Sequence, residues 1–235
     1  MIVTQRSNSS IVRPTAIGIL LILIMVFGAY LRLVGLDWDE NYHLHPDERF
    51  LTLVQSAMLP VDSVNAYFDT IHSTLNPNNV GYGFFVYGNF PMTVIYFLGD
   101  ALDMAGYSRI YLVGRAVSAI TDILSIFFVF LIARRLFDSR VGLIAAALYA
   151  GDALPIQLSH FFTVDAFTNL FVTSAFWFVT RIMDHHSWID IVGFGILFGL
   201  GLASKVNIFP LALILALALA LRVVIHHYDV APEGD

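Results

Sequence analysis

Long apolar runs, separated by short polar turns, make up most of the chain. The first run, Pro14 to Leu36, holds 23 mostly apolar residues, enough to cross about 30 Å of hydrocarbon as a helix. It ends in an acidic segment without a small-residue cleavage site, so we expect a retained helix and not a signal peptide. Five further runs follow, at Tyr111 to Leu136, Val141 to Leu158, Val164 to Met183, Ile189 to Ala203 and Val206 to Ile225. The pattern predicts an all-α, polytopic membrane bundle of about six transmembrane helices.

The composition agrees with a lipid environment. Of the residues, 58% are hydrophobic and only 13% are charged, whereas about 25% of the residues of a soluble domain are charged. The absence of cysteine excludes disulfides and thiolate metal sites. A net charge of −6 provides no basic surface for nucleic acid, so membrane lipids are the expected surroundings.

The positions of the cations predict the orientation in the membrane, because cytoplasmic turns carry an excess of Lys and Arg. A cytoplasmic N-terminus places inside Arg6, Arg13, Arg134, Arg135, Arg140, Arg181 and Arg222. It places outside Arg32, Arg49, Arg109, Arg115 and Lys205. We therefore expect a multi-pass protein of the cell membrane, with cytoplasmic segments 1–13 and 226–235. The transmembrane domain is then 14–225 and includes an extracytoplasmic loop, 37–110.

This loop of about seventy residues is far longer than a usual connection, and long loops in compact proteins are functional or disordered. Its many aromatic residues argue against disorder. Apolar residues at helical spacing in Pro46 to Met58 predict a helix along the membrane surface. The apolar segment Phe90 to Met104 is interrupted by Asp100 and Asp103, which favours a second interfacial or re-entrant helix. A seventh span there is the alternative, and it would invert the topology that follows.

The segment from Asp37 to Phe50 packs five carboxylates and two histidines beside the bilayer. Like charges at this density repel, so they are solvated or serve a base, a cation or a ligand. Acids directly after Pro46 also suit a helix N-terminus without any further role. A divalent cation is a candidate ligand, since the segment offers nitrogen and oxygen donors. Those donors are His43, His45, Asp39, Asp47 and Glu48, although such histidines also serve as plain hydrogen-bonding groups.

Several short motifs occur in an order typical of one family. They are His45-Pro-Asp-Glu-Arg-Phe-Leu, Tyr87-Gly-Asn-Phe-Pro, Gly114-Arg-Ala-Val-Ser-Ala, Ala133-Arg-Arg-Leu-Phe, Gln157-Leu-Ser-His-Phe-Phe-Thr-Val-Asp165 and Gly201-Leu-Ala-Ser-Lys205. From about Leu31 to Pro210 the chain resembles the N-terminal half of glycosyltransferase family 39, which has a GT-C fold. Its relatives include protein O-mannosyltransferases and the bacterial aminoarabinose transferases that modify lipid A. The most specific element is Pro-Asp-Glu directly after the first transmembrane helix.

The resemblance implies transfer of a sugar, a hexose or a pentose, from a polyprenyl or dolichyl phosphate to an acceptor hydroxyl outside the membrane, with inversion at the anomeric carbon. Such a reaction needs a carboxylate to take the acceptor proton and cations to hold the leaving phosphate. By the resemblance, Asp47 is the catalytic aspartate, with Glu48 beside it. Asp39 and Glu40 form a second acidic pair eight residues earlier, and both pairs are candidates.

Arg115 and Lys205 are the best candidates for the donor phosphate, with Arg49 and Arg109 behind them. Cations near the membrane core are costly and are therefore functional candidates, although snorkelling to the headgroups is the alternative. His160 and Asp165 flank the turn before the fourth span and should converge on the face of Asp47. Capping of that helix is the plainer role for Asp165.

The family usually has about a dozen spans, whereas six are expected here. We therefore expect a fragment, one half of a two-subunit enzyme, or a catalytically incomplete accessory or structural subunit of a larger membrane complex. The expected partners are a lipid-linked sugar donor, membrane lipids and a second membrane subunit. A transporter or channel is disfavoured, because the pattern predicts no ionisable residue in the middle of a span with a partner on a neighbouring helix.

Overall fold

The computed structural model describes residues 14–184 and 187–230, and every regular element within them is a helix. The elements are α1 (Pro14–Leu33), α2 (Pro46–Ala57), α3 (Val64–Phe68), η1 (Pro77–Val80), α4 (Asn89–Ala101), α5 (Tyr107–Leu136), α6 (Ser139–Gly151), α7 (Ala153–Ser159), α8 (Val164–Asp184), α9 (Trp188–Leu202), η2 (Val206–Ile208) and α10 (Leu211–Val230). The predicted cytoplasmic segment 1–13, with Arg6 and Arg13, lies outside the described residues. So do the last five residues of the predicted tail.

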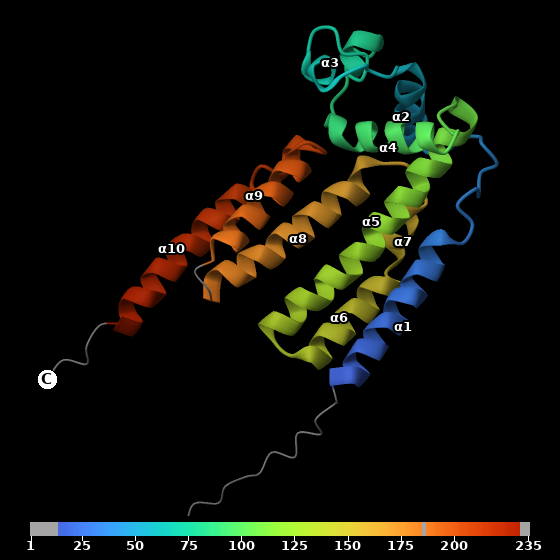
Figure 1. The fold of residues 1–235 in the computed structure, drawn as a ribbon. Coiled ribbons are helices and arrows are strands. Elements are labelled where there is room, and N and C mark those ends of the chain that lie inside the picture. Colours follow the sequence, from blue (N-terminus) through green and yellow to red (C-terminus); the bar gives the residue numbers. More distant parts are fainter. Residues whose placement is uncertain (1–13, 185–186, 231–235) are drawn as a thin grey trace, which may run out of the picture.

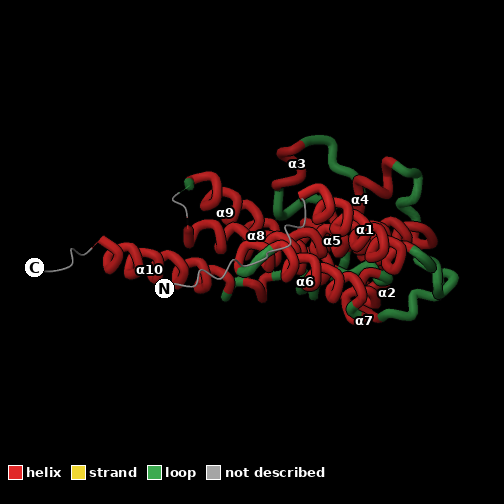
Figure 2. The backbone as a smooth tube through the Cα atoms, turned by 90° about the horizontal axis from the view of Figure 1, so that it is seen from below, coloured by secondary structure: helices red, strands yellow, loops and turns green. Residues whose placement is uncertain are grey.

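The long helices run side by side in two groups (Figures 1 and 2). One group contains α1, α5 and α6, the other contains α8, α9 and α10, and α5 packs closely against α8 between them. Helices α2, α3 and α4 cover one end of the bundle, called here the loop end. The described beginning of α1 and end of α10 both lie at the opposite end (Figure 1).

Four stretches are long and apolar enough to cross a membrane: Thr15–Leu33, Tyr107–Leu136, Val164–Asp184 and Val206–Val224. The bent pair α6 and α7 makes a fifth if it is counted as one span. The prediction of a polytopic helical membrane bundle is confirmed. The count of about six holds only if α9 is included, and its fifteen residues extend for about 22 Å, less than the hydrocarbon thickness.

The run predicted as one helix from Val141 to Leu158 is broken, with a bend of 55° between α6 and α7. Asp152 begins α7 as its N-cap, and its side chain accepts from the Leu154 N–H over 3.4 Å. Pro155 follows, and a proline lacks the N–H that would bond to the carbonyl four residues earlier. A capping aspartate followed by proline is a break signal that the hydropathy pattern conceals.

Both helices predicted in the loop are present, as α2 and α4. Leu51 and Val54 of α2 pack with Met92 and Ile95 of α4 and Ile110 of α5 in one buried core. The thirteen residues of α4 lie across the end of the bundle instead of along it (Figure 1). This arrangement favours the interfacial interpretation of this segment over a seventh span.

One expectation about the membrane interior was wrong, because Asp122, midway along α5, has partners on two neighbouring helices. Nε of Arg32 donates to Asp122 Oδ2 over 2.5 Å, and the hydroxyl of Tyr149 donates to Oδ1 over 2.7 Å. Arg32 also donates to the carbonyls of Gly28 and Ala150. A charge inside lipid is tolerated when it is paired in this way. The polar cluster therefore joins α1, α5 and α6.

Candidate functional site

A buried ion pair ties the loop to the bundle. Nε of Arg115, on α5, donates to Oε2 of Glu48, on α2, over 2.8 Å, and Nη2 donates to Oε1 over 2.5 Å. Both side chains have 0% exposure. Two parallel hydrogen bonds between charged groups are among the stronger polar contacts in proteins. The pair therefore fixes the start of α2 against α5.

Asp39 joins this pair to form the buried frame, which consists of Asp39, Glu48 and Arg115. Oδ1 of Asp39 lies 2.9 Å from Nη2 of Arg115. Burial raises the pKa of Asp39, but a backbone N–H bond and the Arg115 guanidinium outweigh burial, and the pKa lies below its usual value. The N–H of Phe162, just before α8, donates to Glu48 over 2.7 Å. The frame thus holds three distant segments together.

Neither Glu48 nor Arg115 reaches solvent in this arrangement. Their polar atoms are directed at each other, at Asp39 and at backbone groups. Sequence analysis predicts a catalytic role for Glu48 and a phosphate-binding role for Arg115, and in this structure both side chains are buried and bonded to each other. Both residues are therefore placed to hold Asp47, the residue before Glu48, in position.

Asp47 precedes Glu48 in the first turn of α2 and is half-buried. The phenol of Tyr87 lies near the carboxylate of Asp47. Burial, together with the negative charges of Asp47 and Asp165, raises the pKa of Tyr87. Tyr87 is therefore held in its neutral form near two carboxylates.

Lys205 is the cation of this region. Its Nζ donates to Oδ1 of Asp165, in the first turn of α8, over 2.7 Å, and both side chains remain partly exposed. Asp47, Tyr87, Asp165 and Lys205 are called the open cluster below. Of the predicted residues, Asp47, Asp165 and Lys205 are therefore brought together around Tyr87.

Tyr87 reaches the open cluster because its neighbour Gly88 docks on the turn after α9. The N–H of Gly88 donates to the carbonyl of Ser204 over 2.9 Å, and the N–H of Phe90 donates to that of Ala203 over 3.0 Å. A Cβ on Gly88 would lie 1.9 Å from the Ala203 oxygen. Only glycine allows the backbones to approach so closely. The docking joins the segment of Tyr87 to the turn that carries Lys205.

Three other predicted residues lie apart from the open cluster. Nε2 of His160 is 2.9 Å from the carbonyl of Val34, so this histidine ties the end of α1 to the turn after α7. Nε of Arg49 donates to the carbonyl of His43 over 3.0 Å. Glu40 is exposed and has a positive φ of 49°. The contacts of His160 and Arg49 are thus with backbone carbonyls and not with Asp47.

The two histidines of the acidic segment have packing roles. His43 is buried against the rings of Tyr107 and Tyr111, and burial lowers the pKa of its imidazole. His45 caps α2 and stacks on Phe161 with ring centroids 4.2 Å apart. Within the described ranges, no three His, Cys, Asp or Glu side chains are grouped to hold a metal ion. In this arrangement the five predicted donors are therefore not gathered at one point.

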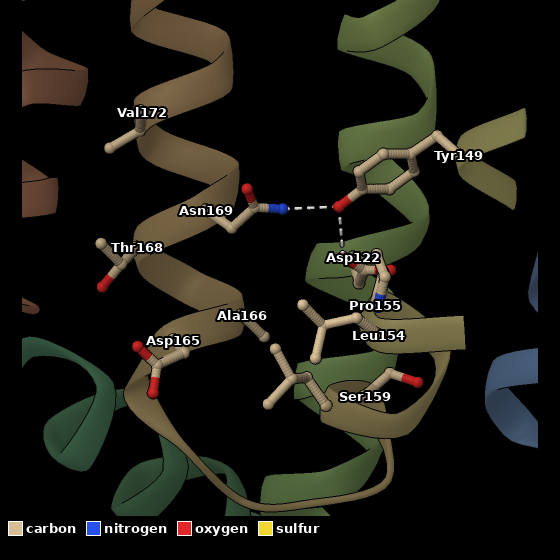
Figure 3. Close-up of a pocket in the computed structure, with 11 residues that line it drawn as sticks. Asp122, Tyr149, Leu154, Pro155, Ser159, Asp165, Ala166, Thr168, Asn169 and Val172 are labelled. Carbon is tan, nitrogen blue, oxygen red and sulfur yellow. Dashed lines mark hydrogen bonds between the residues drawn. The ribbon is translucent and has the colours of Figure 1, made fainter. Parts of the chain in front are cut away.

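A cavity of about 380 Å³ extends from Asp165 into the bundle (Figure 3). At its far end the amide of Asn169 donates to the Tyr149 hydroxyl over 2.6 Å, and that hydroxyl donates to Asp122. Sequence analysis missed this cluster and also the role of Tyr87. The sequence signal that could have identified Asp122 was its position as an acidic residue within the apolar run Tyr111 to Leu136.

Residues 91–228 match the family described as dolichyl-phosphate-mannose-protein mannosyltransferase. The matched region contains Arg115, Asp165 and Lys205 and begins after Tyr87. Neither a curated protein nor a solved structure matches the chain.

Proposed function

Because the chain belongs to the dolichyl-phosphate-mannose-protein mannosyltransferase family, we propose that it transfers a sugar from a polyprenyl-phosphate donor to an acceptor hydroxyl on the extracytoplasmic side. A membrane glycosyltransferase-like function follows from the family. The observation that supports the finer proposal is the open cluster. It sets a carboxylate, Asp47, and a cation, Lys205, around one phenol at the loop end of the bundle.

In the proposed reaction, Asp47 takes the proton of the acceptor hydroxyl, and the acceptor oxygen attacks the anomeric carbon. The bond from that carbon to the phosphate oxygen breaks, and the phosphate leaves with the electron pair. Lys205 stabilises the charge on the leaving phosphate, since its ammonium has three donors and Asp165 takes one of them. Attack opposite the leaving group inverts the anomeric configuration.

The other residues position these two groups. Asp165 orients Lys205, and Tyr87 lies near the carboxylate of Asp47, where its hydroxyl is available as a donor. The buried frame holds Glu48, the residue next to Asp47, without freedom to move. A reactive group held by packed neighbours loses little entropy in reaching its transition-state geometry.

A second candidate is an accessory or structural subunit of a larger membrane complex. The apolar windows of α1 and α10 are only 11% buried in this structure. Such faces suit contact with lipid, and equally with helices of another subunit. The alternative proposal is therefore that the chain packs against a second membrane subunit.

The test uses the full chain in liposomes with radiolabelled polyprenyl-phosphate-linked mannose and a hydroxyl acceptor. Asp47→Asn should lower transfer at least about 100-fold, the usual effect of losing a general base, with an unchanged thermal midpoint. Asp62→Asn, which changes an exposed carboxylate of the same loop, is the matched control. Transfer by Asp47→Asn at the wild-type rate would remove Asp47 from the proposal. Stoichiometric co-purification with an unrelated membrane complex, without turnover of lipid-phosphate sugars, would favour the accessory subunit.

A further inference from the structure

At the end of the bundle opposite the loop end, a recess of about 420 Å³ lies between α5 and α8 (Figure 1). Its charged residues belong to the last turns of the two helices, and its apolar residues lie one or two turns earlier. The recess is therefore charged at its rim and apolar toward the middle of the bundle. We call it the far recess, and its lining residues are Leu131, Arg134, Arg135, Trp177 and Asp184.

The length of α5 places the rim of the far recess at the lipid headgroups. Its thirty residues form one of the stretches that can cross a membrane, and they extend for about 45 Å. The hydrocarbon core is only about 30 Å thick, and the headgroup regions bring the bilayer to about 40–45 Å. Arg134 and Arg135, in the last turn of α5, therefore lie at the level of the lipid phosphates.

Arg135 is fixed, and an acid balances its charge. Its Nε donates to the carbonyl of Thr180 over 3.1 Å, and its Nη2 donates to Oδ2 of Asp184 over 2.6 Å. Both partners belong to α8, so this arginine ties the ends of the two helices together. Because Asp184 neutralises Arg135, the net charge of the far recess is that of Arg134.

Arg134 is exposed and has neither a hydrogen bond nor an ion pair within the part of the chain that the structure describes. Its stem is nevertheless held. The guanidinium carbon lies 5.9 Å from the ring centre of Phe130, and its Cβ is 3.0 Å from the position that a Cβ on Gly142 of α6 would take. A guanidinium has five N–H donors in a planar fork that matches two oxygens of a phosphate. Arg134 thus presents an unused phosphate-binding group.

Trp177 forms the deeper wall of the far recess. Its ring meets that of Phe128 edge-on, with centroids 6.0 Å apart, and the guanidinium carbon of Arg181 lies 4.9 Å from its ring centre. The indole N–H has no hydrogen-bond partner among the described residues. Tryptophan at a membrane interface combines an apolar body with one polar donor. Trp177 and Leu131 therefore suit the region where a headgroup meets its acyl chains.

We propose that the far recess binds the headgroup of a net-anionic glycerophospholipid from the leaflet opposite the loop end. Arg134 pairs with the phosphate, and Trp177 offers its N–H to an oxygen of the headgroup. Basic pockets between transmembrane helices bind anionic headgroups in this way. Snorkelling alone also brings an arginine to the headgroups, but it gives no preference for one lipid. The site lies at the other end of the bundle from the open cluster and does not depend on the proposed transfer reaction.

Binding is measured by native mass spectrometry of the full chain in detergent. The probes are dioleoyl phosphatidylglycerol, dioleoyl phosphatidylcholine and inorganic phosphate. We expect the wild type to bind the first phosphatidylglycerol at least about tenfold more tightly than phosphatidylcholine, the effect of one charged hydrogen-bonded contact. Arg134→Gln should remove this preference while keeping the stem against α6.

Arg140→Gln is the matched control, because it removes the same charge from an exposed arginine at the same end, outside the far recess. It should keep the preference for phosphatidylglycerol. Trp177→Phe keeps an aromatic ring but lacks the N–H, and should weaken phosphatidylglycerol binding about fivefold, the effect of one neutral hydrogen bond.

Three results would overturn the assignment. Equal losses in Arg134→Gln and Arg140→Gln would show a diffuse attraction between basic residues and lipid. Equal binding of the two lipids by the wild type would remove the selectivity for a net-anionic headgroup. Displacement of the bound lipid by inorganic phosphate would identify a site for a soluble anion and not for a lipid.

Discussion

Glu48 and Arg115 lie 67 positions apart in the chain and meet through two hydrogen bonds where neither side chain is exposed. Removing one partner of such a pair leaves the other charge buried and unpaired in a low-dielectric environment. Arg115→Met should therefore lower the free energy of unfolding by about 3–5 kcal/mol. The thermal midpoint of the detergent-solubilised chain measures this loss.

Arg109→Met is the control for that experiment, because Arg109 is an exposed arginine near the start of the same helix. It should leave the midpoint within about a degree of the wild type, as surface substitutions usually do. A wild-type midpoint in Arg115→Met would show that the buried frame does not hold α2 against α5.

Gly88→Ala tests the docking of the Tyr87 segment on the turn that carries Lys205. The added Cβ would lie 1.9 Å from the backbone oxygen of Ala203, an atom that cannot turn away. We expect a destabilisation of about 1–3 kcal/mol, as for other overpacked positions, and a lower transfer rate because these two segments separate. Gly83→Ala, with nothing within 4 Å of its Cβ, should change neither quantity. Equal behaviour of the two variants would argue against the docking.

His43 makes stability depend on pH. Burial lowers the pKa of its imidazole in the folded state, while the unfolded chain has the usual value of about 6.5. Below about pH 6.5 the unfolded state therefore binds a proton that the folded state does not. The free energy of unfolding then decreases as the pH is lowered, until the pH reaches the lowered pKa of the folded state. Above pH 6.5 this contribution is fully present.

The thermal midpoint measured from pH 7.5 down to pH 5 reports this dependence. His43→Asn should flatten the decline, and asparagine tolerates the positive φ of 48° at this position. His72→Asn, at an exposed histidine, should keep the wild-type slope. A steep slope in His43→Asn would assign the acid sensitivity to another group.

The proposed orientation can be tested with single cysteines, since the chain has none of its own. Asn78→Cys, at the loop end, should react with a membrane-impermeant maleimide added to intact cells. Phe137→Cys, in the exposed turn between α5 and α6, should react only after permeabilisation. The reverse pattern would place the loop in the cytoplasm.

Hydropathy was sufficient to predict the helices, because each span needs a long apolar run whatever it packs against. The run Val141 to Leu158 shows the limit of this approach. Its mean character is that of one span, yet Asp152 and Pro155 begin a new helix within it. Local capping and proline geometry determined the result there, and an average over the run does not detect them.

The sequence indicated candidate residue types but not the pairs that they form. The Pro-Asp-Glu motif pointed to Asp47 as the catalytic aspartate and to Glu48 beside it. Backbone geometry separates them, since consecutive helical residues face in different directions and Glu48 turns to the buried Arg115 while Asp47 turns to Tyr87. Contacts over 67 positions follow from the packing of α2 on α5, which no local pattern encodes.

Arg32 and Asp122 are separated by 90 positions, and this spacing has a consequence for biogenesis. Synthesis at about 5–20 residues per second delivers the carboxylate on the order of ten seconds after the guanidinium. During that interval the first helix holds an unneutralised cation at the membrane and has little other surface to bury, with 11% of its window covered even in the finished fold. Insertion of α5 and α6 then supplies Arg32 with its counter-charge and its carbonyl acceptors together. Arg32 therefore gains its partners only after these two helices have been inserted.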